Sequence, residues 1–288
     1  MKAAAAFVLF LIGSAAATEA KDPQDKATLD TITVEAQRER AAVQRRVRSF
    51  VSAIALAPLQ EKLTLWQTQT PICPLVGGLP HDHGEFILTR ISQIAAAAGA
   101  RLAPNFCKPN LYVVVTANAN FLVTEWSKRE PSLFADPDGT KIRSFLKSPK
   151  PIRVWYNAEL FNNDGRPIAI DFQSGLPMTP SSGAPFKWSE MPGLVSVVIL
   201  VDSRRTAGIS FGQLADYVAM AGLAKLRLDA NVGDAPTILQ LFSSSEKAPP
   251  QGLSPWDESF LKALYHTDQT DRTQLAAIKI AVVQDVAP

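Results

Sequence analysis

Hydrophobic side chains recur every three or four positions in several stretches of this chain, and that spacing predicts amphipathic helices. Two of the stretches also carry end signals, because Gly99 follows one as a C-terminal stop and Ser254 precedes another as an N-cap. The predicted helices cover residues 40–54, 84–98, 121–129, 213–225, 254–266 and 275–283.

Shorter stretches dense in β-branched and aromatic residues are typical of buried strands. Three of them are clear, at residues 111–116, 152–156 and 194–201. A turn signal at 162–165 (NNDG) predicts a hairpin as well.

Segments rich in proline, glycine and serine separate these elements. They predict a connector at 71–80, a turn-rich loop at 131–151 that is a candidate lobe boundary, and an irregular loop at 173–193. We therefore expect a single α+β domain over residues 41–288, with a mixed central sheet of four or five strands and flanking helices.

The first twenty residues have the layout of a secretory signal peptide. Lys2 precedes a short apolar run at 3–12 (AAAAFVLFLI), and small residues follow it. Residues 21–40 are polar and predict a flexible tail. No later apolar run reaches the roughly 18 residues that a membrane helix requires. The expected protein is periplasmic or secreted, with no transmembrane segment after signal cleavage.

Composition indicates which class of partner to exclude and which chemical state to expect for the cysteines. Hydrophobic residues make up 47% of the 288 positions, and the formal net charge of +2 is too small to indicate a nucleic-acid partner. Two cysteines in an oxidising compartment favour a disulfide between Cys73 and Cys107. The alternative, a free thiol for catalysis or metal binding, requires an electropositive setting or partner ligands.

Two short motifs are candidates for chemistry. His81 and His83 stand two residues apart, which in an extended loop presents both imidazoles to one metal ion, with Glu85 or His266 as a further ligand. The alternative is a pair of solvated histidines.

The second motif is Gly-x-Ser-x-Gly at 208–212, the pattern of a hydrolase nucleophile elbow, with His266 downstream as a base for Ser210. Residues 202–207 separate it from the preceding strand, whereas a true elbow follows its strand directly. The competing reading makes Ser210 the N-cap of the next helix, with Gln213 completing a capping box.

The helix at 213–225 and the elements before it resemble the core of zincin metalloproteases. Alignment of Gly222 with the glycine after the zincin H-E-x-x-H motif places Ala215 and Ala219 at the two zinc-histidine positions and Asp216 at the general-base position. Alanine cannot bind zinc, so the resemblance implies a catalytically dead scaffold. The alternative is an ordinary amphipathic core helix. The whole chain also resembles uncharacterised exported proteins of Gram-negative bacteria.

The polar tail resembles a TonB box at 30–39 (DTITVEAQRE). That resemblance implies that Ile32, Thr33 and Val34 add a strand to the sheet edge of an envelope protein partner.

These features predict a non-catalytic exported protein that binds another protein and needs no cofactor. The rival interpretation is an enzyme, either a hydrolase using Ser210 and His266 or a metal site at His81 and His83.

Overall fold

The computed structural model describes residues 23–56, 62–134, 139–162, 165–168, 191–243, 248–269 and 273–287. The predicted signal peptide and most of the loop at 173–193 lie outside these residues. The chain divides into two compact units, residues 1–42 and 43–288. Helix α1 (Pro23–Ile54) begins in the first unit and ends in the second.

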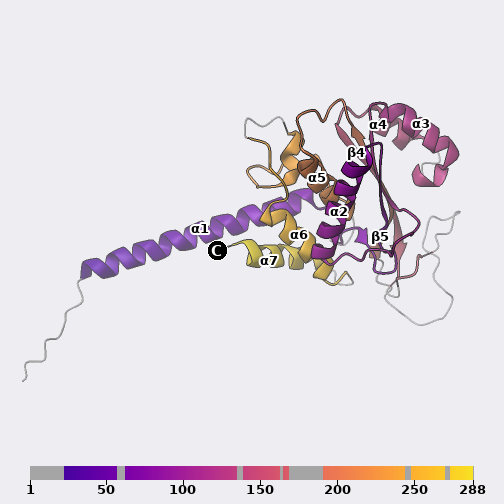
Figure 1. Ribbon diagram of the computed structural model, residues 1–288. Coiled ribbons are helices and arrows are strands. Elements are labelled where there is room, and N and C mark those ends of the chain that lie inside the picture. The colour runs from indigo at the N-terminus through magenta and orange to yellow at the C-terminus, as the bar shows by residue number, and fades with distance from the viewer. Residues whose placement is uncertain are drawn as a thin grey trace, which may run out of the picture. The chain divides into compact units, whose positions relative to one another are not determined.

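A five-stranded sheet forms the centre of the second unit, and its longest strand, β5 (Met191–Asp202), lies in the middle (Figure 1). β3 (Leu111–Thr116) pairs with β5 in parallel along one edge, and β4 (Ile152–Phe161) pairs with it antiparallel along the other. β2 (Pro74–Gly77) pairs in parallel with β3, and the two-residue β1 (Leu65–Trp66) pairs in parallel with the start of β5.

Helices cover both faces of this sheet (Figure 1). The larger core lies under α2 (His81–Ala98), α5 (Phe211–Leu223), α6 (Pro255–His266), α7 (Gln274–Val286) and the end of α1, with the 3₁₀ helix Ile238–Phe242 beside them. The smaller core lies under α3 (Ala119–Arg129), the 3₁₀ helix Pro131–Phe134 and α4 (Thr140–Lys147).

β5 supplies both cores because successive side chains of a strand point to opposite faces. Val197 and Ile199 belong to the larger core, and Val198 and Leu200 to the smaller one. This arrangement confirms the mixed central sheet with flanking helices. The sheet is mostly parallel, and helices connect β2 to β3 and β3 to β4, so the class is mixed α/β rather than α+β.

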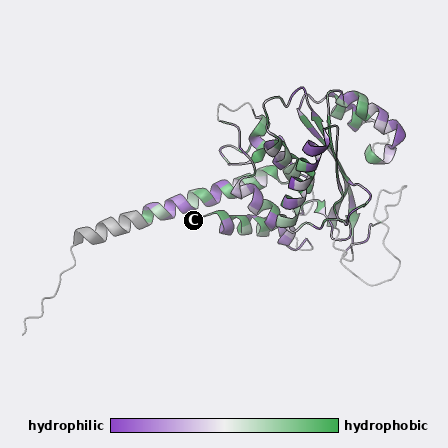
Figure 2. Ribbon diagram, in the orientation of Figure 1, coloured by the Kyte–Doolittle hydropathy of each residue, from purple (hydrophilic) through white to green (hydrophobic). Residues whose placement is uncertain are grey.

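Helix α5 is buried over its whole circumference, from Gln213 to Leu223. A Cβ added at Gly222 would lie 2.9 Å from a methyl carbon of Leu111, so the glycine permits close contact between α5 and the sheet. α2 is different, since its buried residues form one stripe and its outer face is largely polar (Figure 2). α5 therefore lies in the packed interior, and among the pockets found in the described residues only Tyr217 of this helix contributes to a lining.

Three segments differ from the sequence prediction. The connector at 71–80 contains β2, which is fixed by pairing with β3 and has little strand character of its own. The loop at 131–151 contains α4, whose Ile142, Phe145 and Leu146 pack on the smaller core. The candidate lobe boundary at 131–151 stays a prediction, and Phe134 in the same segment is fully buried in that core.

The segment 21–40, expected to be a flexible tail, is helical from Pro23 onward, because α1 begins there. Its residues are polar, which suggested disorder, but alanine, glutamate, glutamine, lysine and arginine are strong helix formers and proline is favoured in a first turn. No helix within the described ranges is long and apolar enough to cross a membrane.

Candidate functional site

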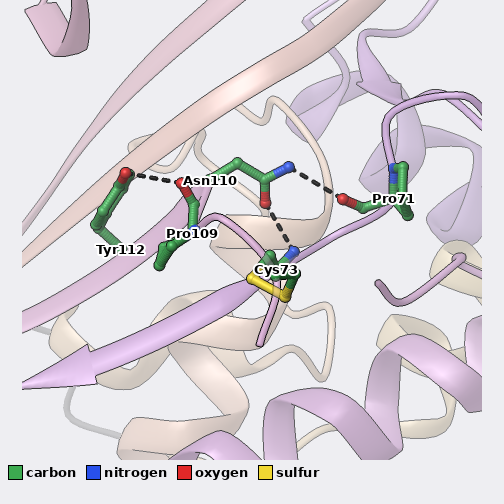
Figure 3. Close-up of a disulfide and its surroundings, with 6 residues drawn as sticks. Pro71, Cys73, Pro109, Asn110 and Tyr112 are labelled. Carbon is green, nitrogen blue, oxygen red and sulfur yellow. Dashed lines mark hydrogen bonds between the residues drawn. A yellow bond between two sulfur atoms is a disulfide. The ribbon is translucent and has the colours of Figure 1, made fainter. Parts of the chain in front are cut away.

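The predicted disulfide is present, and it fastens the connector before β2 to the loop before β3. Cys73 and Cys107 are bonded with their Cα atoms 6.0 Å apart. Asn110 braces the same junction, since its Oδ1 accepts from the Cys73 N–H at 2.7 Å and its Nδ2 donates to the Pro71 carbonyl at 3.0 Å (Figure 3). The loop thus has a covalent anchor and two side-chain hydrogen bonds at its base.

Phe106 stands immediately before this disulfide and is the most exposed large hydrophobic residue in the described ranges. It exposes 107% of its reference surface, and its φ of 63° lies in the left-handed region. No other non-glycine residue of the described chain has a positive φ. A phenylalanine in this backbone conformation is strained, and its exposed ring contributes no free energy of burial. Neither feature therefore stabilises the isolated fold.

Ser210 is the N-cap of α5, as the capping-box interpretation predicts. Its Oγ accepts from the Gln213 N–H at 3.1 Å, and the Gln213 side chain accepts from the Ser210 N–H at 3.0 Å. The structure does not bring His266 to it. Tyr265, next to His266, donates to the Leu223 carbonyl at the far end of α5, and 13 residues of helix span about 20 Å.

His81 and His83 lie in the first turn of α2 rather than in the extended loop that the metal hypothesis assumed. On a helix, residues two positions apart are rotated by about 200° around the helix axis, so their side chains point to nearly opposite sides. His81 lies 3.5 Å from Asp82 and 4.0 Å from Glu85, whereas the ring of His83 stacks on Phe211 with centroids 4.2 Å apart.

His266 cannot complete a site with these two histidines. Its ring lies against Gly99, at the opposite end of α2, and a helix of 18 residues is about 27 Å long. Among the described residues no three His, Cys, Asp or Glu side chains are grouped closely enough to hold a metal ion.

The three α5 positions aligned with the zincin motif are all buried. Asp216 accepts from Nε of Arg90 at 2.6 Å, from Nη2 of Arg90 at 3.1 Å and from the Leu253 N–H at 2.8 Å. The carboxylate therefore has a structural role: it links α5 to α2 through the ion pair with Arg90 and to the segment before α6 through the Leu253 N–H. Ala215 and Ala219 contribute only methyl groups to the core.

A basic pocket that the sequence analysis missed lies where β3 and β5 end. Thr116 and Asp202 are register partners, so the carboxyl ends of both parallel strands meet at this edge of the sheet. The cavity has a volume of about 330 Å³, and five basic side chains and one acidic side chain line it. These are Lys147, Lys150, Arg153, Arg204, Arg205 and Asp202.

The sequence does contain a signal for this pocket. Arg204 and Arg205 directly follow a buried strand, and Lys147 and Lys150 directly precede another. The carboxyl ends of strands are the usual ligand position in open α/β sheets. Residues 202–207 also form the spacer before the Gly-x-Ser-x-Gly motif, and that role hides the basic signal.

The described fold thus defines a mixed α/β domain that carries a disulfide-anchored aromatic loop and a basic pocket. Comparison of the chain with protein-family models, curated proteins and solved structures finds no match.

Proposed function

We propose that this protein is an exported, non-catalytic binding protein that captures a partner protein with the loop around Phe106. The observation that carries the proposal is the fully exposed phenylalanine held at positive φ beside the Cys73–Cys107 disulfide. Backbone strain concentrates at functional positions because selection for folding alone removes it. A partner with an apolar pocket of phenyl size would make use of that strain.

The energetics favour this loop as a binding anchor. Burial of a phenylalanine side chain stabilises a complex by about 1.5 to 3 kcal/mol. Aromatic residues are enriched among the few that dominate interface energies. A loop fixed by a disulfide and by Asn110 loses little conformational entropy on binding, so most of that gain remains as affinity.

The non-catalytic part of the proposal rests on helix α5. In the sequence alignment behind the zincin resemblance, the ligand and base positions hold two buried alanines and an aspartate that is already paired with Arg90. The order of α2, β3, β4, β5 and α5 supports a degenerate zincin-like scaffold, since the same succession led to the resemblance. Such a scaffold retains the fold and offers its loops for recognition.

Export is the third part of the proposal, and two features support it. The first twenty residues have the layout of a signal peptide. The disulfide belongs to compartments that permit oxidation, such as the periplasm or the extracellular space.

A pull-down from envelope extract with three variants tests the proposal. Phe106→Ala removes the ring, and Phe106→Gly also relieves the strain at positive φ. Phe121→Ala is the matched control, because Phe121 exposes 64% of its surface on α3, outside the loop. Both Phe106 variants should reduce partner capture by about tenfold or more, which corresponds to about 1.4 kcal/mol.

Stability measurements on the same variants separate binding from folding. Phe106→Gly should unfold at the same urea concentration as the wild type or a higher one. The relief of backbone strain in the folded state offsets the larger conformational entropy that glycine gives the unfolded chain. Equal capture by the wild type and both Phe106 variants would overturn the proposal.

The N-terminal segment is a separate partner prediction. Ile32, Thr33 and Val34 lie within helix α1, and the strand addition that the TonB-box resemblance implies stays a prediction. A partner for this segment would have to bind a helix or unwind it. Deletion of residues 29–39, followed by the same pull-down, tests whether the segment contributes.

A further inference from the structure

We propose that the basic pocket at the carboxyl ends of β3 and β5 binds a phosphate group. The inference is independent of the Phe106 loop, because no residue of the loop lines the pocket.

Arg153 is the buried cation of the pocket. It exposes only 6% of its surface, and its guanidinium carbon lies 5.6 Å from the centre of the Phe145 ring. One nitrogen, Nη1, donates to Asn120 Oδ1 at 2.9 Å and to the carbonyls of Phe145 and Leu146 at 3.2 Å each. In the described part of the chain Nε and Nη2 have no acceptor within the protein, and no carboxylate hydrogen-bonds to this arginine; neither nitrogen is fully buried, so both are accessible to a ligand.

Burial without such a partner is unfavourable for Arg153. Desolvation lowers its pKa from the usual value, and the charge of Arg205 acts in the same direction, while that of Asp202 partly opposes them. A buried cation of this kind is stabilised when an anion supplies the missing charge and the missing acceptors. An oxyanion in the pocket would supply both.

The protein's own acidic groups neutralise only part of the charge of the remaining cations. Asp202 is shared between Arg204, whose Nε lies 3.2 Å from Oδ1, and Arg205, whose Nε lies 3.5 Å from Oδ2. Lys150 pairs with Asp229 at 3.2 Å. Lys147 at the end of α4 lines the pocket as well.

The start of α3 adds backbone donors to these side chains. Ala119 and Asn120 line the cavity in the first turn of an 11-residue helix, where N–H groups lack intrahelical acceptors. Asn118 caps only the third of these groups, the N–H of Phe121, at 3.4 Å. Donors thus approach from α3, α4, β4 and the end of β5.

Convergence from four elements selects the class of ligand. A planar carboxylate has two oxygens to offer, whereas a phosphate group has at least three in a tetrahedral arrangement and more negative charge. Guanidinium groups bind phosphate strongly, and a cavity of about 330 Å³ holds a small molecule. The phosphate belongs either to a free small molecule or to a lipid headgroup, and these two sources share the same chemistry.

Titration calorimetry with inorganic pyrophosphate at low ionic strength tests the pocket directly. The pocket variant is Lys147→Glu with Arg204→Glu, both on exposed side chains. The control variant, Arg101→Glu with Lys108→Glu, changes the net charge equally at exposed positions outside the pocket. The dissociation constant should rise about tenfold or more in the pocket variant and by less than about threefold in the control.

Vesicle flotation distinguishes the two sources. Vesicles that contain phosphatidic acid are compared with vesicles of phosphatidylcholine alone, with the same two variants. Flotation that the pocket variant loses and pyrophosphate inhibits assigns the site to a headgroup, and pyrophosphate binding without flotation assigns it to a free ligand. Absence of both, or equal loss in the two variants, would overturn the proposal; thermal unfolding confirms that each variant is folded.

Discussion

Arg90 and Asp216 join helices α2 and α5 through an ion pair in which the Arg90 Nε lies 2.6 Å from Oδ1 of Asp216. The carboxylate is buried, and the Leu253 N–H also donates to it at 2.8 Å. The residue that aligns with the catalytic base of a zincin is therefore a structural crosslink in the interior of this fold.

Replacement of Asp216 should lower the stability of the fold, and the account predicts no effect on an enzymatic rate. Asp216→Ala leaves the Leu253 N–H and the Arg90 guanidinium without their acceptor, and we expect the free energy of unfolding to fall by about 2 to 3 kcal/mol. Asp216→Asn retains one acceptor oxygen and should cost less. Asp82→Ala, on the exposed start of α2, is the control, and urea unfolding is the measurement. Equal stability of the Asp216→Ala and Asp82→Ala variants would contradict this account.

Removal of the disulfide should cost about 3 to 4 kcal/mol in the chain-entropy treatment, because it closes a loop with a sequence separation of 34. The Cys73→Ser and Cys107→Ser double variant should therefore unfold at a lower urea concentration than the wild type. Dithiothreitol should lower the wild-type midpoint and leave that of the double variant unchanged. A midpoint for the double variant equal to that of the oxidised wild type would show that the bond adds nothing to stability.

Ser210 should behave as a helix cap. Ser210→Ala should lower the free energy of unfolding by about 1 kcal/mol, while Ser210→Asp should retain most of it, since aspartate is also a favourable N-cap. A fluorophosphonate probe should label neither the wild type nor the Ser210→Ala variant. Labelling of the wild type that disappears in Ser210→Ala would restore the hydrolase interpretation.

These cases show which parts of the structure were predictable from the sequence. The C-terminal end of α2 at Gly99 and the capping box of Ser210 depend on a few neighbouring residues, so local patterns predicted both. The central strand β5 was predictable because its long run of β-branched residues is buried on both faces.

Elements fixed by distant partners could not be predicted in this way. β2 exists because it pairs with β3, and its proline and glycine obscure it in the sequence. The basic pocket needs three-dimensional convergence, since Lys147, Arg153 and Arg204 come from separate segments that only the sheet brings together. Phe106 was missed because a single exposed ring leaves no periodic pattern.

Asp257 should make stability depend on pH in the acid range. Burial raises its pKa above the ordinary value of 3.8, although the Thr237 hydroxyl and the N–H groups of Ile238 and Ser254 partly offset this by donating to the carboxylate. Because the folded-state pKa is the higher one, the unfolded chain loses this proton first as the pH rises. The contribution to stability is therefore full below pH 3.8 and is lost as the pH rises through the raised folded-state pKa.

Urea unfolding of the wild type and of Asp257→Asn at several pH values checks this sign. The variant should be less stable at every pH, because an amide cannot accept all of these hydrogen bonds. The wild type should lose stability relative to the variant as the pH rises above 3.8. Parallel profiles, or a relative gain by the wild type, would contradict the assignment.

Site-specific photo-cross-linking in cells tests the proposed function most directly. A benzophenone amino acid replaces Phe106 in one variant and Phe121 in the other, so that both probes occupy exposed aromatic positions. If the anchored loop captures a partner, irradiation gives one discrete adduct from position 106 that is absent from position 121. No adduct at position 106, or the same adducts at both positions, would contradict the account.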